Sequence, residues 1–474
     1  MKTFYFPDNQ SLAFGSVRQK AADNLSALQM LKEKNGLPAS PEQQRILSRY
    51  TGWGDTAVYN HAAAELDGML EKAELDALKA SMLNAHYTSL PIIHALWQGV
   101  TQVFDENISS LRILDPSAGI GHFRSVEPVS WREKSHWLEV ELEPLTAQIL
   151  GHLHPNSERS TVYAGGFETA PVQAKQFDLV ISNVPFGNYP VVDAEITDKR
   201  LKASIHDYFL CKAVEVTAPG GLVAIITSRY TLDKKDSFVR RWVARHAELL
   251  AAARLPENAF KENAGTQVVT DALFLRKREN VLAEDALLPD WVDVVEMPLE
   301  NKDGETHSVP VNSYYAVHSE HALGRACLTR GMYAANEYTL KAEAGVVIAD
   351  KLATVLEAAL PVNLITNATG NLRAELPVRG EPAHVIPIPD KTRARERKQL
   401  KALRELYDLA HALLQSEIDG NRQAEALRIR LNEAYDNYLL YYGALTSKHT
   451  QKLLKGNPAL PFLRALEVDT GTGM

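Results

Sequence analysis

Three segments carry residues whose types and spacing suit ligand binding at the edge of a parallel sheet. The first, LRILDPSAGIGHF, is an apolar run that ends in Asp115 and is followed by Gly119 and Gly121. Ligands of doubly wound sheets bind beyond the carboxyl ends of the strands, and glycines there let the backbone approach them closely. The spacing is neither GxGxxG nor GxxxxGK[ST], which disfavours a dinucleotide and a nucleoside triphosphate. The segment therefore predicts a site for another cofactor.

The second segment, HWLEVELEP, places Glu141 at the end of the next apolar run. An acidic side chain at this point can accept the ribose hydroxyls of a nucleoside cofactor. Glu139, Glu141 and Glu143 alternate along the run, which also fits a solvated strand edge. Both interpretations are open from this segment alone.

The third segment, FDLVISNVPFG, ends a buried run with Asn183, Val184, Pro185 and Phe186. These residues suit an amino group on a planar base, because the Asn183 side-chain oxygen and the Val184 carbonyl can accept its two hydrogens. Phe186 can stack on the base, as in sites for flipped bases, and Pro185 makes the turn rigid. The alternative is a capped turn with a buried phenylalanine.

The elements that must position these segments are short β-rich runs that alternate with amphipathic helical stretches from about residue 81 to 280. This pattern predicts an α/β fold with a doubly wound, mainly parallel sheet of seven strands. The expected strands are 111–115, 136–141, 161–164, 177–182, 221–227, 248–255 and 267–275.

Three further regions flank the sheet domain of residues 81–280. Residues 1–80 are expected to be helical, and they include the turn RYTGWGD, in which Trp53 contacts DNA or a partner or, as we favour, packs in the core. Residues 281–390 are expected to be irregular or small β structure, with the apolar runs VVIAD and HVIPIP, and to contribute to DNA recognition. Residues 391–474 are expected to form a helical hairpin that turns near residues 419–420.

Composition limits the classes of protein that fit. The chain has 474 residues, of which 45% are hydrophobic and 23% charged, as in globular proteins. Its two cysteines, Cys211 and Cys327, cannot form paired CxxC zinc units, and Cys211 is expected in the core. No secretion signal and no apolar run of about 20 residues is found, so we expect a cytoplasmic protein without membrane spans.

A net charge of −8 means that any DNA-binding surface must be local. Two basic stretches are candidates, and each fits phosphate binding or a plain solvated helix face. The first comprises Arg229, Lys234, Lys235, Arg240, Arg241 and Arg245, and the second comprises Lys391, Arg393, Arg395, Arg397, Lys398, Lys401 and Arg404.

The motifs DPSAGIGHF, VELEP, SNVPF and NAHYTS together resemble those of S-adenosylmethionine-dependent, adenine-specific DNA methyltransferases, DPxxGxGxF and [NDS]PP[YFW]. From about residue 20 onward, RYTGWGD, NVPFGNYPV, IHDYFLCKA and the segment from RLPENAF through AGTQVVTDALFL resemble more narrowly the large methylase-helicase proteins of phages and conjugative elements, antirestriction proteins among them. This chain has no GxxxxGK[ST], so the helicase part is not encoded in these residues.

The resemblance implies a Rossmann-like methyltransferase sheet and assigns roles to individual residues. Asn183, Val184, Pro185 and Phe186 would hold the target adenine. The residues that would bind S-adenosyl-L-methionine are Tyr87 and Thr88 at its methionine end, Asp115, Ser117, Gly119 and Gly121 in its cradle, Glu141 at its ribose and Phe167 beside its adenine.

The sequence departs from the family pattern at three places. Gly166 stands where many relatives have an aspartate beside the cofactor's adenine, with Glu168 as a substitute. Val184 replaces the first proline of the tetrad, and Ser89 replaces the proline of a YTP motif.

The expected activity is methyl transfer to the exocyclic amine of adenine in DNA, in a restriction-modification, antirestriction or mobile-element setting. Expected partners are DNA and a separate helicase or other defence or antirestriction subunit. Two other functions are open. One is a catalytically weakened methylase fold that serves as a DNA-binding or antirestriction component, and the other is methyl transfer to RNA or to protein glutamine.

Overall fold

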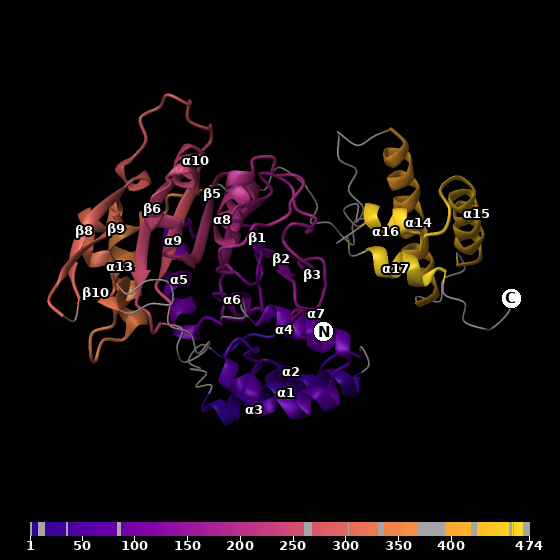
Figure 1. Cartoon of the computed structure of the whole chain (residues 1–474). Helices are drawn as coiled ribbons and strands as arrows, with labels where there is room; N and C mark the ends of the chain where they lie inside the picture. Colours follow the sequence, from indigo (N-terminus) through magenta and orange to yellow (C-terminus); the bar gives the residue numbers. More distant parts are fainter. Residues whose placement is uncertain are drawn as a thin grey trace. The chain divides into compact units, whose positions relative to one another are not determined.

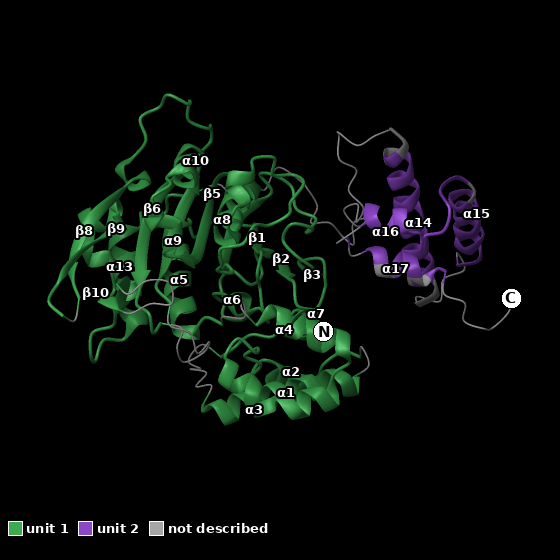
Figure 2. Cartoon of the chain, viewed as in Figure 1, with its two compact units in different colours: residues 1–378 green, residues 379–474 purple. Residues whose placement is uncertain are grey.

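The computed structural model describes residues 2–7, 15–34, 37–82, 87–259, 268–301, 303–329, 336–366, 394–418, 424–454, 457 and 459–467. The chain forms two compact units, residues 1–378 and 379–474 (Figure 2). Some segments singled out from the sequence lie outside the described residues. They are 84–86 of NAHYTS, 260–267, the run HVIPIP and the helix connection near 419–420.

The first unit is built around one seven-stranded sheet (Figure 1). Its strand order is β3-β2-β1-β4-β5-β7-β6, and neighbouring strands are parallel except for β7, which runs antiparallel to β5 and β6. Each expected run forms a strand, so the predicted fold class is confirmed. The strands are β1 (Leu111–Asp115), β2 (Ser135–Glu141), β3 (Ser160–Ala164), β4 (Phe177–Asn183), β5 (Thr217–Ser228), β6 (Ala247–Leu255) and β7 (Thr270–Lys277).

Both faces of the sheet are buried. In β4, Val180 belongs to the hydrophobic cluster on one face, whereas Leu179 and Ile181 belong to the cluster on the other. Successive side chains of a strand point to opposite faces, so a strand covered on both sides must be apolar almost throughout. Asp178 is a buried polar residue of this strand, and its carboxylate accepts the backbone N–H of Arg112 at 2.8 Å.

Helices of the described chain cover both faces. Helices α8 and α10 contribute to the cluster that contains Val180, and α5 and α13 contribute to the opposite cluster. Cys211 of α8 is buried, as predicted. Gly99 lets α5 and α13 approach closely, because a Cβ there would lie 2.9 Å from Leu360 Cδ1. The bounds are α5 (Leu90–Val103), α8 (Ile205–Val216), α10 (Phe238–His246) and α13 (Ile348–Ala359).

The N-terminal helices pack on α7. A third hydrophobic cluster joins Leu28 of α1 and Leu66 of α3 to Ile149 of α7. The extended residues 2–7 also join the sheet domain, since the Phe4 N–H donates to the Leu153 carbonyl at 2.8 Å. The bounds are α1 (Val17–Lys34), α2 (Pro41–Leu47), α3 (Thr56–Met69), α4 (Lys72–Ser81), α6 (His122–Ser125) and α7 (Pro144–Leu153).

The described part of the region after β7 holds two antiparallel strand pairs, β8–β9 and β10–β11, and the helices α12 and α13. The prediction that VVIAD is irregular or β structure is wrong, because this run leads into α13. Ala349, Leu352 and Leu356 are buried at helical spacing, and a short apolar run alone does not distinguish a strand from a helix. The other elements are α9 (Tyr230–Asp233), β8 (Val294–Glu300), β9 (Thr306–Asn312), α12 (Ser313–Val317), β10 (Arg325–Thr329), β11 (Glu337–Lys341) and the 3₁₀ turns η1 (Lys199–Lys202), η2 (Asp290–Val292) and η3 (Ser319–His321).

The second unit contains the predicted helical hairpin. Its helices α14 (Ala394–Ile418) and α15 (Ala424–Tyr442) pack together, and the Gln399 side chain near the start of α14 donates to the Tyr438 hydroxyl near the end of α15 at 2.9 Å. They therefore run antiparallel. Two short helices, α16 (Lys448–Leu453) and α17 (Ala459–Ala465), follow. Among the described helices of the whole chain, none is long and apolar enough to cross a bilayer.

Candidate active site

A cavity of about 680 Å³ opens beside the carboxyl ends of β1, β2 and β4. The chain leaves β1 here between β2 on one side and β4 on the other, which is the switch point where ligands of doubly wound sheets bind. Among the described lining residues are eight of the twelve proposed from the sequence, namely Tyr87, Thr88, Ser117, Gly119, Glu141, Phe167, Asn183 and Pro185. The other four, Asp115, Gly121, Val184 and Phe186, are not among the lining residues described.

Asp115 holds the loop after β1 by hydrogen bonds, although it is not among the described residues that line the cavity. Its Oδ1 accepts the Ser182 hydroxyl at 2.7 Å and the Ser117 N–H at 3.2 Å. The carboxyl group is fully buried, and burial raises its pKa to about 8. Asp115 thus links the loop after β1 to the end of β4, which carries Asn183.

Glu141 and Gly119 form the polar wall of the cavity. The Gly119 N–H donates to Glu141 Oε2 at 2.9 Å, and the Glu143 N–H donates to Glu141 Oε1 at 2.8 Å. These bonds fix the carboxylate beside the glycine loop. Burial raises the pKa of Glu141 to about 7. The arrangement contradicts a plain solvated strand edge for this residue and leaves a carboxylate available to a hydroxyl-bearing ligand.

Gly121 supports the loop by packing rather than by lining the cavity. Its φ is +83°, a conformation that favours glycine, and a Cβ there would lie 2.3 Å from the His154 ring. His154 is itself buried, with Nδ1 2.7 Å from a carboxylate oxygen of Glu139. The second glycine of the motif is therefore required by the buried imidazole behind the loop.

Tyr87 and Thr88 line the cavity, and Tyr87 lies next to Gly119. A Cβ on that glycine would lie 3.1 Å from the Tyr87 ring. The hydroxyl of Thr88 is buried, and no described residue offers it a hydrogen-bond partner. A buried hydroxyl at a cavity wall without a protein partner suits a polar ligand.

The turn RYTGWGD supports Tyr87. Trp53 is buried, which confirms core packing, and its ring meets Tyr50 edge-on at 6.5 Å. Tyr50 in turn meets Tyr87 edge-on at 6.5 Å. The Asn24 side chain holds the turn by donating to the Gly52 carbonyl at 2.6 Å and accepting the Thr51 N–H at 2.7 Å.

The four residues from Asn183 to Phe186 divide between the cavity and the core. Asn183 and Pro185 line the cavity. Val184 is buried in the hydrophobic cluster next to α8, and its N–H donates to the Ile226 carbonyl at 3.0 Å. Phe186 is half-buried against the cluster on the opposite face. The structure thus brings Asn183 to the cavity, whereas stacking of Phe186 on a base stays a prediction.

Phe167 and Glu168 lie at the cavity wall beyond β3. Phe167 is almost fully buried, with its ring 5.3 Å from that of Phe209. A Cβ on Gly166 would lie 2.2 Å from the Glu168 carboxylate, so the absence of a side chain at residue 166 gives this carboxylate its room. Glu168 also lines the cavity, at the place where the sequence offered it as a substitute acid.

The segment after Phe186 is anchored by a buried ion pair, Asp193 with Lys212, that was not expected from the sequence. Tyr189, Pro190 and Val192 line the cavity and are exposed. Directly after them, the buried Asp193 carboxylate accepts the Lys212 ammonium at 2.8 Å and the Tyr208 hydroxyl at 2.7 Å. The available signal was a single lysine, Lys212, in the apolar helical stretch YFLCKAV.

Replacing Lys212 by methionine leaves the buried Asp193 carboxylate without its cation. Breaking a buried ion pair in this way costs about 3–5 kcal/mol, and we expect the free energy of unfolding in urea to fall by about 3 kcal/mol. The exposed pair of Lys235 and Glu296, 3.1 Å apart, provides the control. Lys235→Met should change the free energy of unfolding by less than about 1 kcal/mol. Equal losses in the two variants would contradict the anchoring role.

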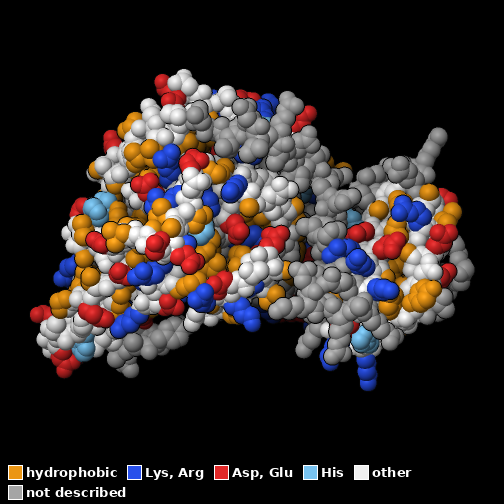
Figure 3. Space-filling model, turned by 90° about the horizontal axis from the view of Figure 1, so that it is seen from above, with side chains coloured by type: hydrophobic (Ala, Val, Ile, Leu, Met, Phe, Trp, Pro, Cys, Tyr) orange, Lys and Arg blue, Asp and Glu red, His pale blue; other side chains and the backbone are white. Residues whose placement is uncertain are grey.

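The first basic stretch is largely neutralised. Five of its side chains lie beside a carboxylate, and Arg240 is buried and donates to the Val292 carbonyl at 2.7 Å. A plain solvated face is therefore the wrong interpretation for Arg240. Figure 3 likewise shows basic and acidic side chains interspersed on the visible face. The five paired residues are Arg229, Lys234, Lys235, Arg241 and Arg245.

The second basic stretch is only partly described. Lys391 and Arg393 lie outside the described residues, as do the side chains of Arg395 and Arg397. Lys398 and Lys401 are exposed on α14, which fits either of the two interpretations. Arg404 is half-buried on the same helix. A solvated helix face and DNA contact by this stretch both stay predictions.

No family model matches the chain. It is similar to the "Defense against restriction protein B" of Escherichia phage P1, with 28% identity over 275 residues. The match covers 56% of this chain and 10% of the relative. The chain thus spans about a tenth of the length of this relative.

Solved structures of methyltransferases are also similar. The methyltransferase subunit of a type I restriction-modification system from Streptococcus thermophilus is 17% identical, with a TM-score of 0.36 over 58% of this chain and 67% of that one. The M protein of the type I restriction enzyme EcoKI is 16% identical, with a TM-score of 0.32 over 73% and 91%. The mixed seven-stranded sheet, in which β7 runs antiparallel to β5 and β6, and its flanking helices are like the class I S-adenosylmethionine-dependent methyltransferase fold.

Proposed function

We propose that the chain binds S-adenosyl-L-methionine and transfers its methyl group to the exocyclic amine of adenine in DNA. The observation that carries this proposal is the shared cavity, in which Glu141 and the Gly119 loop face the same space as Asn183. The proposed cofactor-binding wall of Glu141 and Gly119 and the Asn183 side-chain amide thus line the same cavity at the switch point. The setting we propose is restriction-modification or antirestriction, which agrees with the name of the phage P1 relative.

The residues present fit the proposed cofactor. The Glu141 carboxylate suits two ribose hydroxyls, Gly119 leaves room beside Tyr87, and the Thr88 hydroxyl is buried at the wall without a described protein partner. Phe167 and Glu168 would lie beside the adenine of the cofactor. When bound, S-adenosylmethionine supplies a methyl group activated by its sulfonium charge.

The chain's own residues would position the acceptor amine. In the proposed mechanism, the Asn183 side-chain oxygen and the Val184 carbonyl accept its two hydrogens, which keeps the nitrogen lone pair from conjugating with the ring. They also stabilise the positive charge that develops on that nitrogen. Partners that we propose are DNA and a separate helicase or other defence or antirestriction subunit.

Two measurements test the proposal. The first is calorimetric binding of S-adenosylmethionine, and the second is transfer of labelled methyl to unmethylated DNA, followed by digestion to nucleosides. We expect binding, with label in methyladenine. Binding with label only in RNA or protein would assign another acceptor, and binding without transfer to any of them would assign a weakened methylase fold that serves as a binding component.

The raised pKa of Glu141 predicts pH-dependent cofactor binding. With a pKa of about 7, about a tenth of the carboxyl groups are ionised at pH 6 and about nine-tenths at pH 8. Only the carboxylate accepts two hydroxyls, so the affinity for S-adenosylmethionine should rise about tenfold between these values. Calorimetry at both pH values measures this rise, and Glu141→Gln should abolish it. An equal rise in the variant would assign the pH dependence to another group.

A further inference from the structure

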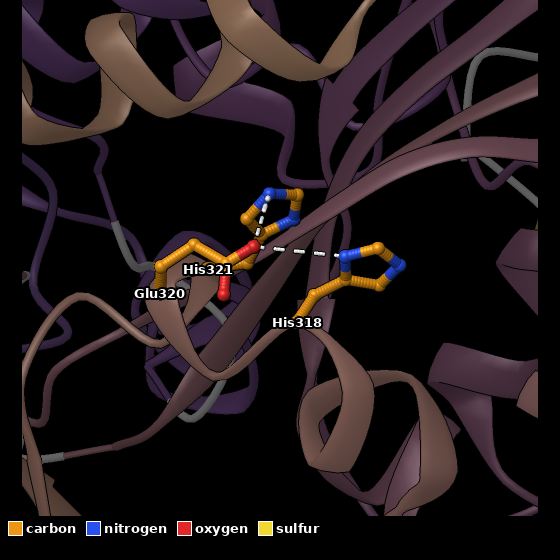
Figure 4. Close-up of side chains that lie close together, drawn as sticks. All are labelled: His318, Glu320 and His321. Atoms are coloured by element: carbon orange, nitrogen blue, oxygen red, sulfur yellow. Dashed lines mark ion pairs between the residues drawn. The ribbon is translucent and has the colours of Figure 1, made fainter.

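A group of potential metal ligands lies outside the cavity, at the residue after α12 and within the η3 turn. Figure 4 shows the Glu320 carboxylate between the rings of His318 and His321. Glu320 Oε1 lies 3.6 Å from His318 Nδ1 and 3.5 Å from His321 Nε2, and the three ligand atoms all lie within 4.8 Å of one another. Two imidazole nitrogens and a carboxylate oxygen are a common donor set for Zn²⁺.

Hydrogen bonds on the far side of His321 determine which nitrogen faces Glu320. His321 Nδ1 lies 3.2 Å from the Ala252 carbonyl and 2.9 Å from the Tyr314 hydroxyl. In the neutral tautomer whose Nδ1 N–H donates to the Ala252 carbonyl, Nε2 presents its lone pair toward Glu320. That lone pair and the Glu320 oxygen are both acceptors, and a cation between them can be coordinated by both.

The surroundings of the three side chains match those of metal sites. Metal-bound histidines typically donate their other ring N–H to a carbonyl or carboxylate, as His321 does to Ala252. Around a tetrahedral zinc ion, with bonds of about 2.0–2.2 Å, ligand atoms lie roughly 3.3–3.6 Å apart. The two distances to Glu320 Oε1 are already near this range, and the ring of His318, whose side chain is 44% exposed, stacks on the His321 ring with centroids 5.1 Å apart.

We propose that His318, Glu320 and His321 form a binding site for a divalent ion of the zinc type, with water at the remaining coordination positions. The site would connect η3 to β6, because His321 contacts Ala252 and the backbone of Ala322 pairs with that of Arg254. Strand β6 is at the edge of the sheet. The bound ion would thus stabilise this edge, independently of any methyl transfer.

The test measures metal on the full chain, prepared without a polyhistidine tag and freed of metal by a chelator. We expect about one Zn²⁺ per chain by atomic absorption and calorimetry, and a rise in Tm of about 3–8 °C at Zn²⁺ near 100 times its Kd. His318→Ala and Glu320→Ala should reduce bound zinc to background and abolish the rise. Both side chains are exposed, so both variants should keep the circular dichroism spectrum of the wild type.

Two control variants separate this site from other zinc ligands. His61→Ala removes an exposed histidine on α3, and Cys327→Ser removes the thiol that is not fully buried. Both should retain about one Zn²⁺ per chain. Three results would overturn the proposal: no zinc bound by the wild type, equal binding by wild type and His318→Ala, or loss of zinc in Cys327→Ser.

Discussion

In the Asn183→Ala variant, methyl transfer to DNA is expected to fall about 100- to 1,000-fold, as when one group that stabilises developing charge is removed from an active site. Asn183 lies at the last position of β4, and its backbone is held in register with Ile226 of β5. The proposed role of its side-chain oxygen is to accept an amine hydrogen that becomes more acidic during transfer. The alanine variant removes that acceptor and keeps the strand.

Two comparisons make this prediction specific. Asn183→Asp keeps an oxygen acceptor and should retain more activity than Asn183→Ala, whereas Asn107→Ala, at an exposed asparagine before β1, should be fully active. Single-turnover rates with labelled cofactor measure the chemical step, and calorimetry should show unchanged S-adenosylmethionine affinity in all three. Full activity in Asn183→Ala would remove Asn183 from the mechanism while leaving the cofactor site intact.

The second large effect is expected at Glu141. Hydrogen bonds to a charged group contribute about 1.5–3 kcal/mol each, and Glu141 is proposed to accept two from the cofactor ribose. Its loss in Glu141→Ala should therefore raise the Kd for S-adenosylmethionine by about a hundredfold or more. The variant also removes the acceptor for the Gly119 N–H, which loosens the loop beside the same ligand.

Calorimetric titration with S-adenosylmethionine measures this change in Kd. Glu106→Ala provides a matched control, because Glu106 is exposed in the loop before β1, at the amino end of that strand. It should bind the cofactor as the wild type does. If Glu141→Ala bound S-adenosylmethionine with wild-type affinity, Glu141 would have no role in holding the cofactor ribose.

The motifs after the strands could be predicted because they depend on local chain geometry. An apolar run buried on both faces identifies a central strand, and Gly119 with a φ of +57° and Gly121 with a φ of +83° identify the turn that follows. Strand order then brings the carboxyl ends of β1, β2 and β4 together. Asp115, Glu141 and Asn183 were located by this reasoning, although only the last two line the cavity.

The roles of residues that depend on contacts between distant segments could not be predicted in the same way. Gly121 was grouped with the cofactor cradle, yet His154, 33 residues later in the sequence, is what requires a glycine there. The basic stretch from residue 229 to 245 fitted phosphate binding and a solvated helix face equally, but five of its six cations lie next to carboxylates, most of them from other elements. A sequence pattern shows the charge of a side chain and not its neighbour in space.

The seven strands, the glycine turn, the helical hairpin and the amide at the end of β4 could be located from the sequence, because each follows from hydrophobic periodicity or from backbone conformations within a few residues. Which of those side chains reach the cavity depends on the packing of distant segments. This packing buries Val184 in one core, packs the half-buried Phe186 against the other and places Asn183 at the cavity, and it brings His321 against the carbonyl of Ala252. These outcomes depend on which faces are covered by α5, α8 and α13, and such packing is fixed by residues far apart in the chain.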